Sequence, residues 1–276
     1  MATSPIRRWV VPKARLSSAG RARPSRRLPL VVGALVLGLG AVAQAYILPG
    51  VSILRRMTEG RDDLQISALK IEGTLSFFGP AAKEAGAALG VAADRPELQT
   101  DAQVFLKLPG RCRLEASTVE GGKVSVAVES NGKRRIEGAE IPALSVALSA
   151  LCPLLASRSA TENEARTTVE RQLAKLKVDL RKSSLARFGG QVAYVLGDPA
   201  EGSPQLWVYK DSFLPARLRF AEADGTAWDV RLLDYGSPAT GEWFPRVVEV
   251  SKAGQPWLKL TGVTAEAKPK LDDKLF

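Results

Sequence analysis

The sequence of 276 residues predicts an α+β fold in which helices pack against one face of a single curved antiparallel sheet. Apolar and polar side chains alternate, as in half-buried strands, in the first half of the chain and again towards its end. Two helical patterns stand between these stretches. Turn residues separate the later strands at intervals of about 8–12 residues, a spacing typical of a meandering antiparallel sheet.

The first 45 residues predict an export signal. They carry eight Lys or Arg and no acidic residue, and an uncharged apolar run extends from Leu28 to Leu48. Ala43 and Ala45 supply the small side chains that a signal peptidase requires, so we predict cleavage after Ala45, by either the general secretory or the twin-arginine route. The alternative is an uncleaved inner-membrane anchor. Either form places residues 46–276, as a single domain, in the periplasm.

The formal net charge of +10 does not predict nucleic-acid binding. The basic excess lies in the signal segment, since 31 basic and 29 acidic residues follow residue 45. The chain has no histidine, which excludes the common nucleophilic triads and most zinc sites. Two Ser-x-x-Lys matches, Ser67–Lys70 and Ser130–Lys133, fall in a strand and a hairpin turn instead of at a helix start. We therefore expect no enzyme, no cofactor and no metal.

The first half predicts strands, with a helix before them and another among them. The first helix covers Val51–Leu64, and a second, around Ala81–Val91, interrupts the strands. Asn131-Gly132 is a strong hairpin signal. The apolar side chains that alternation places on one face of these strands are Leu69, Ile71, Leu75, Phe77, Val104, Leu106, Leu108, Cys112, Leu114, Ala116, Val124, Val126 and Val128.

The middle of the chain predicts two helices. Ile141–Ala156 is apolar almost all round, and Pro153 is expected to kink or end this helix. The next helix is expected to begin at Thr161, where Thr161–Glu164 fits a capping box. The later strands are predicted at Gln191–Leu196, Gln205–Tyr209, Arg217–Phe220, Ala227–Tyr235, Phe244–Ser251 and Trp257–Val263.

This order of elements resembles the LolA-like family of periplasmic outer-membrane lipoprotein carriers and related lipid-binding domains. The stretches that carry the resemblance are Val104–Pro109, Ser130–Lys133, Gln205–Phe220 and Leu271–Phe276, and together it spans about residues 51–276. It implies an unclosed antiparallel β-barrel whose concave face is covered by helices. Leu108 stands where well-studied carriers have an arginine that reaches the lid, so the gating mechanism of those carriers is not carried over.

The resemblance also implies a function, an exported carrier that holds acyl chains in an apolar cup. The expected partners are lipid or lipoprotein acyl chains and inner- or outer-membrane components, bound by a monomer. A membrane-anchored envelope sensor with the same fold is the alternative. The residues expected to bind an acyl chain are Leu69, Ile71, Leu75, Phe77, Val104, Leu106, Leu108, Val124, Val126, Val128, Leu144, Leu148, Leu151 and Leu155.

Three features of the predicted cup allow two interpretations each. The helix over Leu144–Leu155 is either a lid above a pocket or a core helix that fills the concavity. Three late arginines could meet an anionic head group or lie on a solvated face: Arg217, Arg219 and Arg231. Four tryptophans could line a rim or pack the sheet: Trp207, Trp228, Trp243 and Trp257.

Cys112 and Cys152 are the only cysteines. Export to the periplasm permits a disulfide between them, which would tie the apolar helix to the sheet. Two buried free thiols are the alternative.

Overall fold

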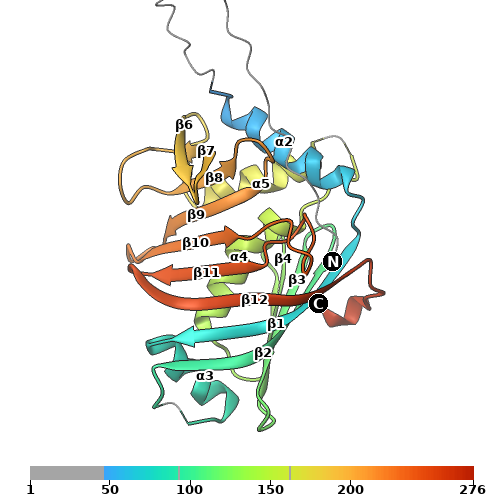
Figure 1. Ribbon diagram of the computed structural model, residues 1–276, viewed down its shortest axis with the longest axis vertical. Helices are drawn as coiled ribbons and strands as arrows, with labels where there is room; N and C mark the ends of the chain where they lie inside the picture. Colours follow the sequence, from blue (N-terminus) through green and yellow to red (C-terminus); the bar gives the residue numbers. More distant parts are fainter. Residues whose placement is uncertain (1–46, 93, 162) are drawn as a thin grey trace, which may run out of the picture. The chain divides into compact units, whose positions relative to one another are not determined.

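The structure is a computed structural model that describes residues 47–276, except 93 and 162. The predicted signal segment, residues 1–45, and the cleavage site after Ala45 therefore lie outside the described residues. The described chain forms one 12-stranded antiparallel sheet in the order β5-β4-β3-β2-β1-β12-β11-β10-β9-β8-β7-β6 (Figure 1). The two end strands do not pair with each other, so the sheet stays open. This confirms the α+β class and the unclosed curved sheet.

The first four strands lie where the alternation predicts them, and a fifth follows. Their bounds are β1 (Ala68–Phe78), β2 (Glu97–Lys107), β3 (Arg111–Ser117), β4 (Lys123–Glu129) and β5 (Arg134–Glu137). Helix α3 (Pro80–Leu89) interrupts the connection between β1 and β2, yet these strands pair over their whole length, with Ile71 opposite Val104. Val104 lies opposite Leu114, and Leu114 opposite Val126, so one apolar face continues across four strands.

The later strands complete the sheet. They are β6 (Ser183–Phe188), β7 (Gln191–Gly197), β8 (Gln205–Tyr209), β9 (Pro215–Ala221), β10 (Ala227–Leu233), β11 (Val247–Lys252) and β12 (Gln255–Ala267). Strand β12 lies beside β1 and so joins the two halves of the sheet (Figure 1). Its register with β1 shifts at Glu72/Gly73, where a Cβ on Gly73 would lie 2.1 Å from the carbonyl oxygen of Thr261. Only glycine allows this close approach.

Several predicted strand boundaries were wrong. Phe244 precedes β11, which begins at Val247, because Pro245 has no N–H for the ladder. Strand β10 ends at Leu233, and residues 234–246 form a long connection instead of continuing the sheet. Strand β12 runs to Ala267 and not to Val263. The hairpin signal at Asn131-Gly132 is confirmed by the pairing of β4 with β5, whereas the bounds of β5 and β6 were not predicted.

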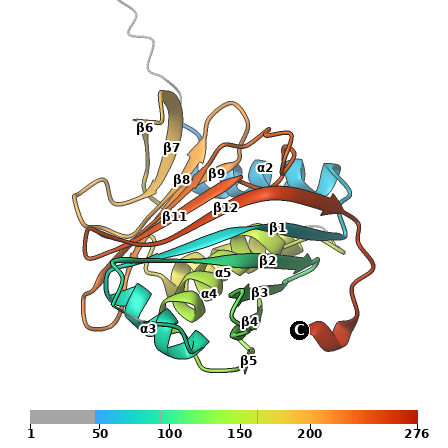
Figure 2. The ribbon, with the colours of Figure 1, turned by 60° about the horizontal axis from the view of Figure 1, so that its bottom comes forward.

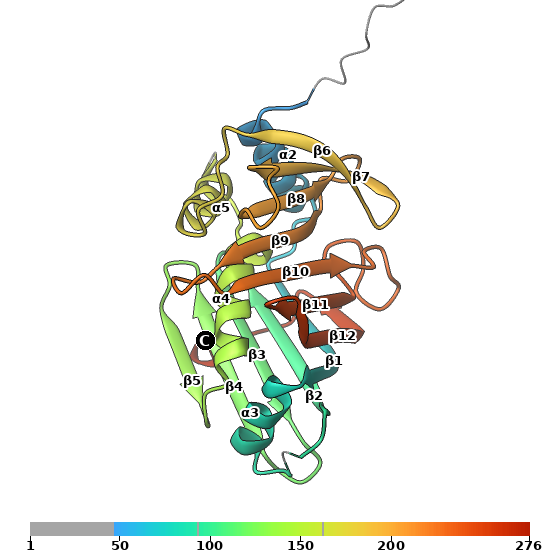
Figure 3. The same ribbon diagram turned by 90° about the vertical axis from the view of Figure 1, so that its left-hand side faces the viewer.

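The helices cover the concave face of the sheet. Their bounds are α2 (Gly50–Asp63), α4 (Pro142–Ala156) and α5 (Glu164–Lys175), besides α3 and the short 3₁₀ helix η1 (Asp273–Leu275). Helix α4 lies in the concavity and packs on β3 and β4, while α5 packs on α2 and α4 (Figures 2 and 3). Among the described residues, no helix has both the length and the apolar character that crossing a membrane requires.

The end of the helix predicted over residues 141–156 is confirmed, whereas the predicted start of the next helix is wrong. Helix α4 continues through Pro153 to Ala156, so this proline does not end it. Proline has no N–H for the carbonyl four residues earlier, and Gln172 of α5 donates to that carbonyl, on Ser149, over 3.2 Å. The capping box at Thr161 is absent: α5 begins at Glu164, and its N-cap residue, Asn163, has left-handed backbone and makes no side-chain capping bond.

The last residues of the chain cross the outer face of the sheet. Lys107 Nζ donates to the carbonyl of Leu271 over 2.9 Å, and Arg113 Nη1 donates to the carbonyl of Leu275 over 2.8 Å. This face is opposite to the one that carries α4.

Candidate functional site

A small apolar chamber lies between α4 and the sheet. Its volume is about 60 Å³, and its wall contains only apolar side chains and the two cysteines. Of the residues predicted to bind an acyl chain, these line it: Leu75, Val104, Leu106, Leu144, Leu148, Leu151 and Leu155. The structure thus brings together side chains of β1, β2 and α4, as the alternation predicted.

The other predicted residues lie on the same buried face but outside the chamber. They are Leu69, Ile71, Phe77, Leu108, Val124, Val126 and Val128, and all belong to the hydrophobic core. The rest of the chamber wall was not among the residues predicted to bind an acyl chain. It consists of Cys112, Leu114, Ala147, Cys152, Phe244, Val248, Val250, Leu258 and Leu260. Alternation in the late strands was a usable signal for four of these residues, Val248, Val250, Leu258 and Leu260.

The chamber is too small for a long ligand in this conformation. Ligand pockets usually measure about 300–1,000 Å³, and about 60 Å³ is well below that range. Helix α4 therefore almost fills the concavity, as the core-helix interpretation predicts. An acyl chain can enter only if α4 or the side chains around it move.

Cys112 of β3 and Cys152 of α4 form a disulfide, with their Cα atoms 5.8 Å apart. Cys152 lies in the last turns of α4, so the covalent tie holds that end of the helix to the sheet. Both cysteines line the chamber.

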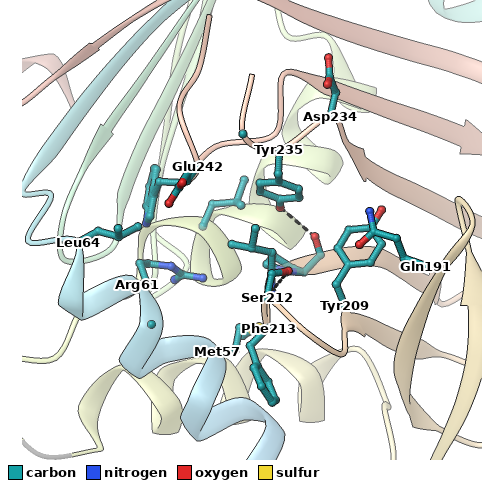
Figure 4. Close-up of a pocket in the computed structure, with 16 residues that line it drawn as sticks. Met57, Arg61, Leu64, Gln191, Tyr209, Ser212, Phe213, Asp234, Tyr235 and Glu242 are labelled. Carbon is teal, nitrogen blue, oxygen red and sulfur yellow. Dashed lines mark hydrogen bonds between the residues drawn. The ribbon is translucent and has the colours of Figure 1, made fainter. Parts of the chain in front are cut away.

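A second, larger pocket opens beside the C-terminal end of α4. Its volume is about 670 Å³, within the range of ligand sites. Figure 4 shows its wall, to which α2, the β8–β9 connection and the connection after β10 contribute. Leu155, in the last turn of α4, lines both this pocket and the apolar chamber. The two spaces therefore meet at one side chain.

Arg61 brings a positive charge into the wall of this pocket. It lies in the last turn of α2 and is only 7% exposed. Its Nη1 atom donates to the carbonyl oxygen of Ser157 over 3.1 Å and to the Oγ of Ser157 over 2.8 Å. Its guanidinium carbon lies 5.9 Å from the ring centre of Trp243. Figure 4 shows the side chain extending from α2 towards the space beside Tyr235.

Two tyrosines form a largely apolar wall opposite Arg61. The rings of Tyr209 and Tyr235 meet edge to face, with centroids 6.5 Å apart. Tyr235 donates its hydroxyl hydrogen to the carbonyl oxygen of Pro215 over 2.8 Å. Burial raises the pKa of both hydroxyls above the ordinary value, so both are neutral at physiological pH.

The late arginines are not part of either space. Arg217 forms a bidentate ion pair with Asp229 of the neighbouring strand, with N–O distances of 2.7 and 2.6 Å, and stacks on Trp207. It projects from the opposite side of β9 to its buried neighbours Ala216 and Leu218. Arg219 and Arg231 share that outer side, so the solvated-face interpretation describes the structure.

Of the four tryptophans, only Trp243 lines the large pocket. Trp228 stacks on Phe220 with ring centroids 6.1 Å apart. Trp257 lies 5.2 Å from the ammonium of Lys252. The described residues contain no group of three or more acidic or cysteine side chains placed to hold a metal ion.

Comparison with known proteins finds similarity only among solved structures. No family model matches the chain, and no curated protein matches it. A LolA superfamily protein, NE2245 from Nitrosomonas europaea, is 13% identical with a TM-score of 0.46, and the match covers 83% of this chain and 97% of that one. A DUF1329 family protein from Desulfovibrio piger is 12% identical with a TM-score of 0.42, covering 82% and 95%. A structure of MucB is 15% identical with a TM-score of 0.30, covering 82% and 61%. All three TM-scores are below 0.5, and the open sheet with helices on its concave face is therefore described from this chain alone.

Proposed function

We propose that this protein is an exported, non-catalytic protein of the cell envelope that binds acyl chains of a lipid or lipoprotein between α4 and the concave face of the sheet. The observation that carries the proposal is the wholly apolar chamber under α4, which meets a ligand-sized pocket at Leu155. Voids larger than a water molecule are few in a folded core, and this one has an entirely apolar wall beside a pocket of ligand size.

Acyl-chain binding is energetically reasonable here. Each methylene that leaves water contributes about 0.8 kcal/mol. A chain of about 14–16 carbons, even if only partly enclosed, therefore offsets the cost of association and of moving α4. Because the disulfide holds Cys152 to β3, entry past Leu155 requires side chains to move at that end, while the N-terminal part of α4 is free to move away from the sheet and enlarge the chamber.

A charge inside the chamber tests the proposal. Leu148 lines the chamber and is 9% exposed, whereas Ser149, the next residue of α4, is half-buried and outside the chamber wall. In the full chain, Leu148→Glu should abolish binding of a fluorescent fatty acid, and Ser149→Glu should retain it. Melting temperatures measured beside binding separate a ligand site from packed core. A Leu148→Glu protein that stays folded has lost only the ligand, and one that unfolds has lost its core.

Leu148→Ala keeps the test decisive if Leu148→Glu unfolds. It enlarges the chamber and should strengthen fatty-acid binding, at a stability cost of about 2–5 kcal/mol. Wild-type protein that is folded and binds no acyl probe contradicts the proposal. Mass spectrometry of lipid that co-purifies with the protein would identify the natural ligand.

Export has a separate test. A reporter enzyme that is active only outside the cytoplasm, fused after Phe276, should be active, and activity confined to the cytoplasm contradicts export. N-terminal sequencing then distinguishes a protein that begins at Tyr46 and can diffuse from one that keeps its anchor.

A further inference from the structure

Arg61 is a buried charge without an opposite charge. Only Nη1 of its guanidinium makes hydrogen bonds, both to Ser157, and in the described part of the chain no carboxylate lies within 4.0 Å of it. Arginine is almost never this buried unless it is paired. Burial lowers the pKa of Arg61 to about 10, so the group is still charged at neutral pH. The folded protein therefore holds a positive charge that its own described side chains do not neutralise.

The same pocket wall contains a second donor without an acceptor. Trp243 is 5% exposed and lines the pocket, and its indole Nε1 has no hydrogen-bond partner among the described residues. Buried donors are normally satisfied, and each one left unpaired is costly. Arg61 and Trp243 are neighbours in the pocket wall, with the guanidinium carbon of Arg61 5.9 Å from the centre of the indole ring. An acceptor placed in this pocket would satisfy free donors of both residues.

The acidic residues of the pocket do not fill this role. Asp234 is paired with Arg246, with an N–O distance of 3.0 Å. Glu242 also lines the pocket and is exposed. The other nearby cation, Arg56, lies over the ring of Phe213, at 5.3 Å from its centroid. The lining thus contains one cation, Arg61, and two carboxylates, of which Asp234 is paired with Arg246 and Glu242 is exposed.

We propose that the pocket of about 670 Å³ binds the anionic head, a carboxylate or a phosphate, of an amphiphile whose acyl chain passes Leu155 into the chamber under α4. The guanidinium fork matches the oxygens of either group, and hydrogen bonds between two charged partners are the stronger kind. The placement of the acyl chain rests on the acyl-binding function proposed above. The anionic head group is the new element, and it defines the chemical class of the ligand. Arg61 then selects acidic amphiphiles over neutral ones of equal length.

Three probes of the same chain length test the selection in the full chain. They are hexadecanoic acid, hexadecyl phosphate and hexadecanol, each below its aggregation concentration. The charged probes should bind about 10- to 100-fold more tightly than the alcohol, the range expected of charge-assisted hydrogen bonds. The tighter of the two charged probes identifies the head as carboxylate or phosphate. Equal affinity of all three probes overturns the proposal.

Variants of helix α2 assign the effect to Arg61. Arg61→Met should lower the affinity for both charged probes to that for the alcohol and leave the alcohol unchanged. Arg61→Lys keeps the charge and should recover part of the preference. Arg55→Met is the matched control, since Arg55 belongs to the same helix, is exposed and does not line the pocket. A preference that survives Arg61→Met, or is lost in Arg55→Met, overturns the assignment.

A block at Leu155 separates failure of this inference from failure of the acyl-binding function. Leu155→Trp should weaken all three probes about equally because it closes the passage used by the tail. If the probes bind without regard to charge and Leu155→Trp still weakens them, the head site falls and acyl binding stands. If no 16-carbon probe binds, both the proposed acyl-binding function and the proposed amphiphilic ligand are contradicted. Inorganic phosphate that then binds through Arg61 would show an isolated anion site.

Discussion

Replacing Arg61 with methionine should leave the folded protein almost as stable as the wild type, although it changes a side chain that is only 7% exposed. Burial lowers the pKa of this guanidinium from 12.5 to about 10, and a tenfold change in proton affinity is worth about 1.4 kcal/mol. Keeping the charge inside the folded protein therefore costs about 3 kcal/mol. Removing the guanidinium ends this cost but leaves the buried carbonyl and hydroxyl oxygens of Ser157 without their donor, at a cost of about 1–3 kcal/mol.

These contributions nearly cancel, so the free energy of unfolding of Arg61→Met should lie within about 2 kcal/mol of the wild-type value. Urea unfolding followed by tryptophan fluorescence measures the difference. A loss of about 4 kcal/mol or more would refute the reasoning, because it is the cost of breaking a buried ion pair. It would mean that Arg61 has an acidic partner in the folded protein.

The pH dependence of this difference has a definite sign. The folded protein holds the proton of Arg61 less tightly than the unfolded chain, so the unfavourable contribution is fully present below pH 10. It disappears as the pH rises through about 10 towards 12.5. The wild type should therefore gain stability relative to Arg61→Met only above pH 10, and the difference should be constant between about pH 6 and pH 9.

Two further predictions concern covalent and ionic ties. Replacing Cys112 and Cys152 with alanine opens a loop set by their separation of 40 residues and should lower the unfolding free energy by about 4 kcal/mol in the chain-entropy model; two thiols that react in denatured, unreduced protein would show that no bridge forms. The hydrogen bond and the charge of Lys107 lower the pKa of Asp273 from 3.8, so its hold on the C-terminal segment should persist above pH 3.8 and be lost as the pH falls through the lowered value. In Asp273→Asn, amide hydrogen exchange of residues 271–276 should be faster than in the wild type, while that of β2 is unchanged. Equal exchange rates in the variant and the wild type contradict the prediction.

The sequence was informative where a local pattern decides the structure. The alternation around Ile71, Val104 and Val126 placed their side chains on one face, because in a strand every second side chain points the same way. The register then carried that face across neighbouring strands. The bounds of the end strands β5 and β6 were not predicted, because each strand is short and none of its residues is fully buried. Such a strand has no apolar face that an alternating pattern could show.

The opposite wall of the chamber depends on long-range pairing. Val250 and Leu258 reach the chamber only because β12 lies beside β1, almost two hundred residues away along the chain. Alternation identifies the strands, but the pairing of β12 with β1 depends on how the whole open sheet is assembled around α4. The size of the chamber is equally non-local, since it depends on how completely α4 fills the concavity.

The charged pocket did leave a signal in the sequence. Helix α2 buries one stripe that contains Ile53, Leu54 and Met57, and Arg61 occupies the next place in that stripe, four residues after Met57. An arginine on the buried side of an amphipathic helix contradicts the local pattern, and such contradictions concentrate at functional sites. The sequence could not show whether another helix or strand supplies an acidic partner for Arg61. That required the positions of Ser157 and Trp243, which come from segments about one hundred residues or more away and reach Arg61 only in the folded chain. The stripe therefore indicates where a charge is buried, and the fold shows that no carboxylate of the described residues lies within 4.0 Å of it.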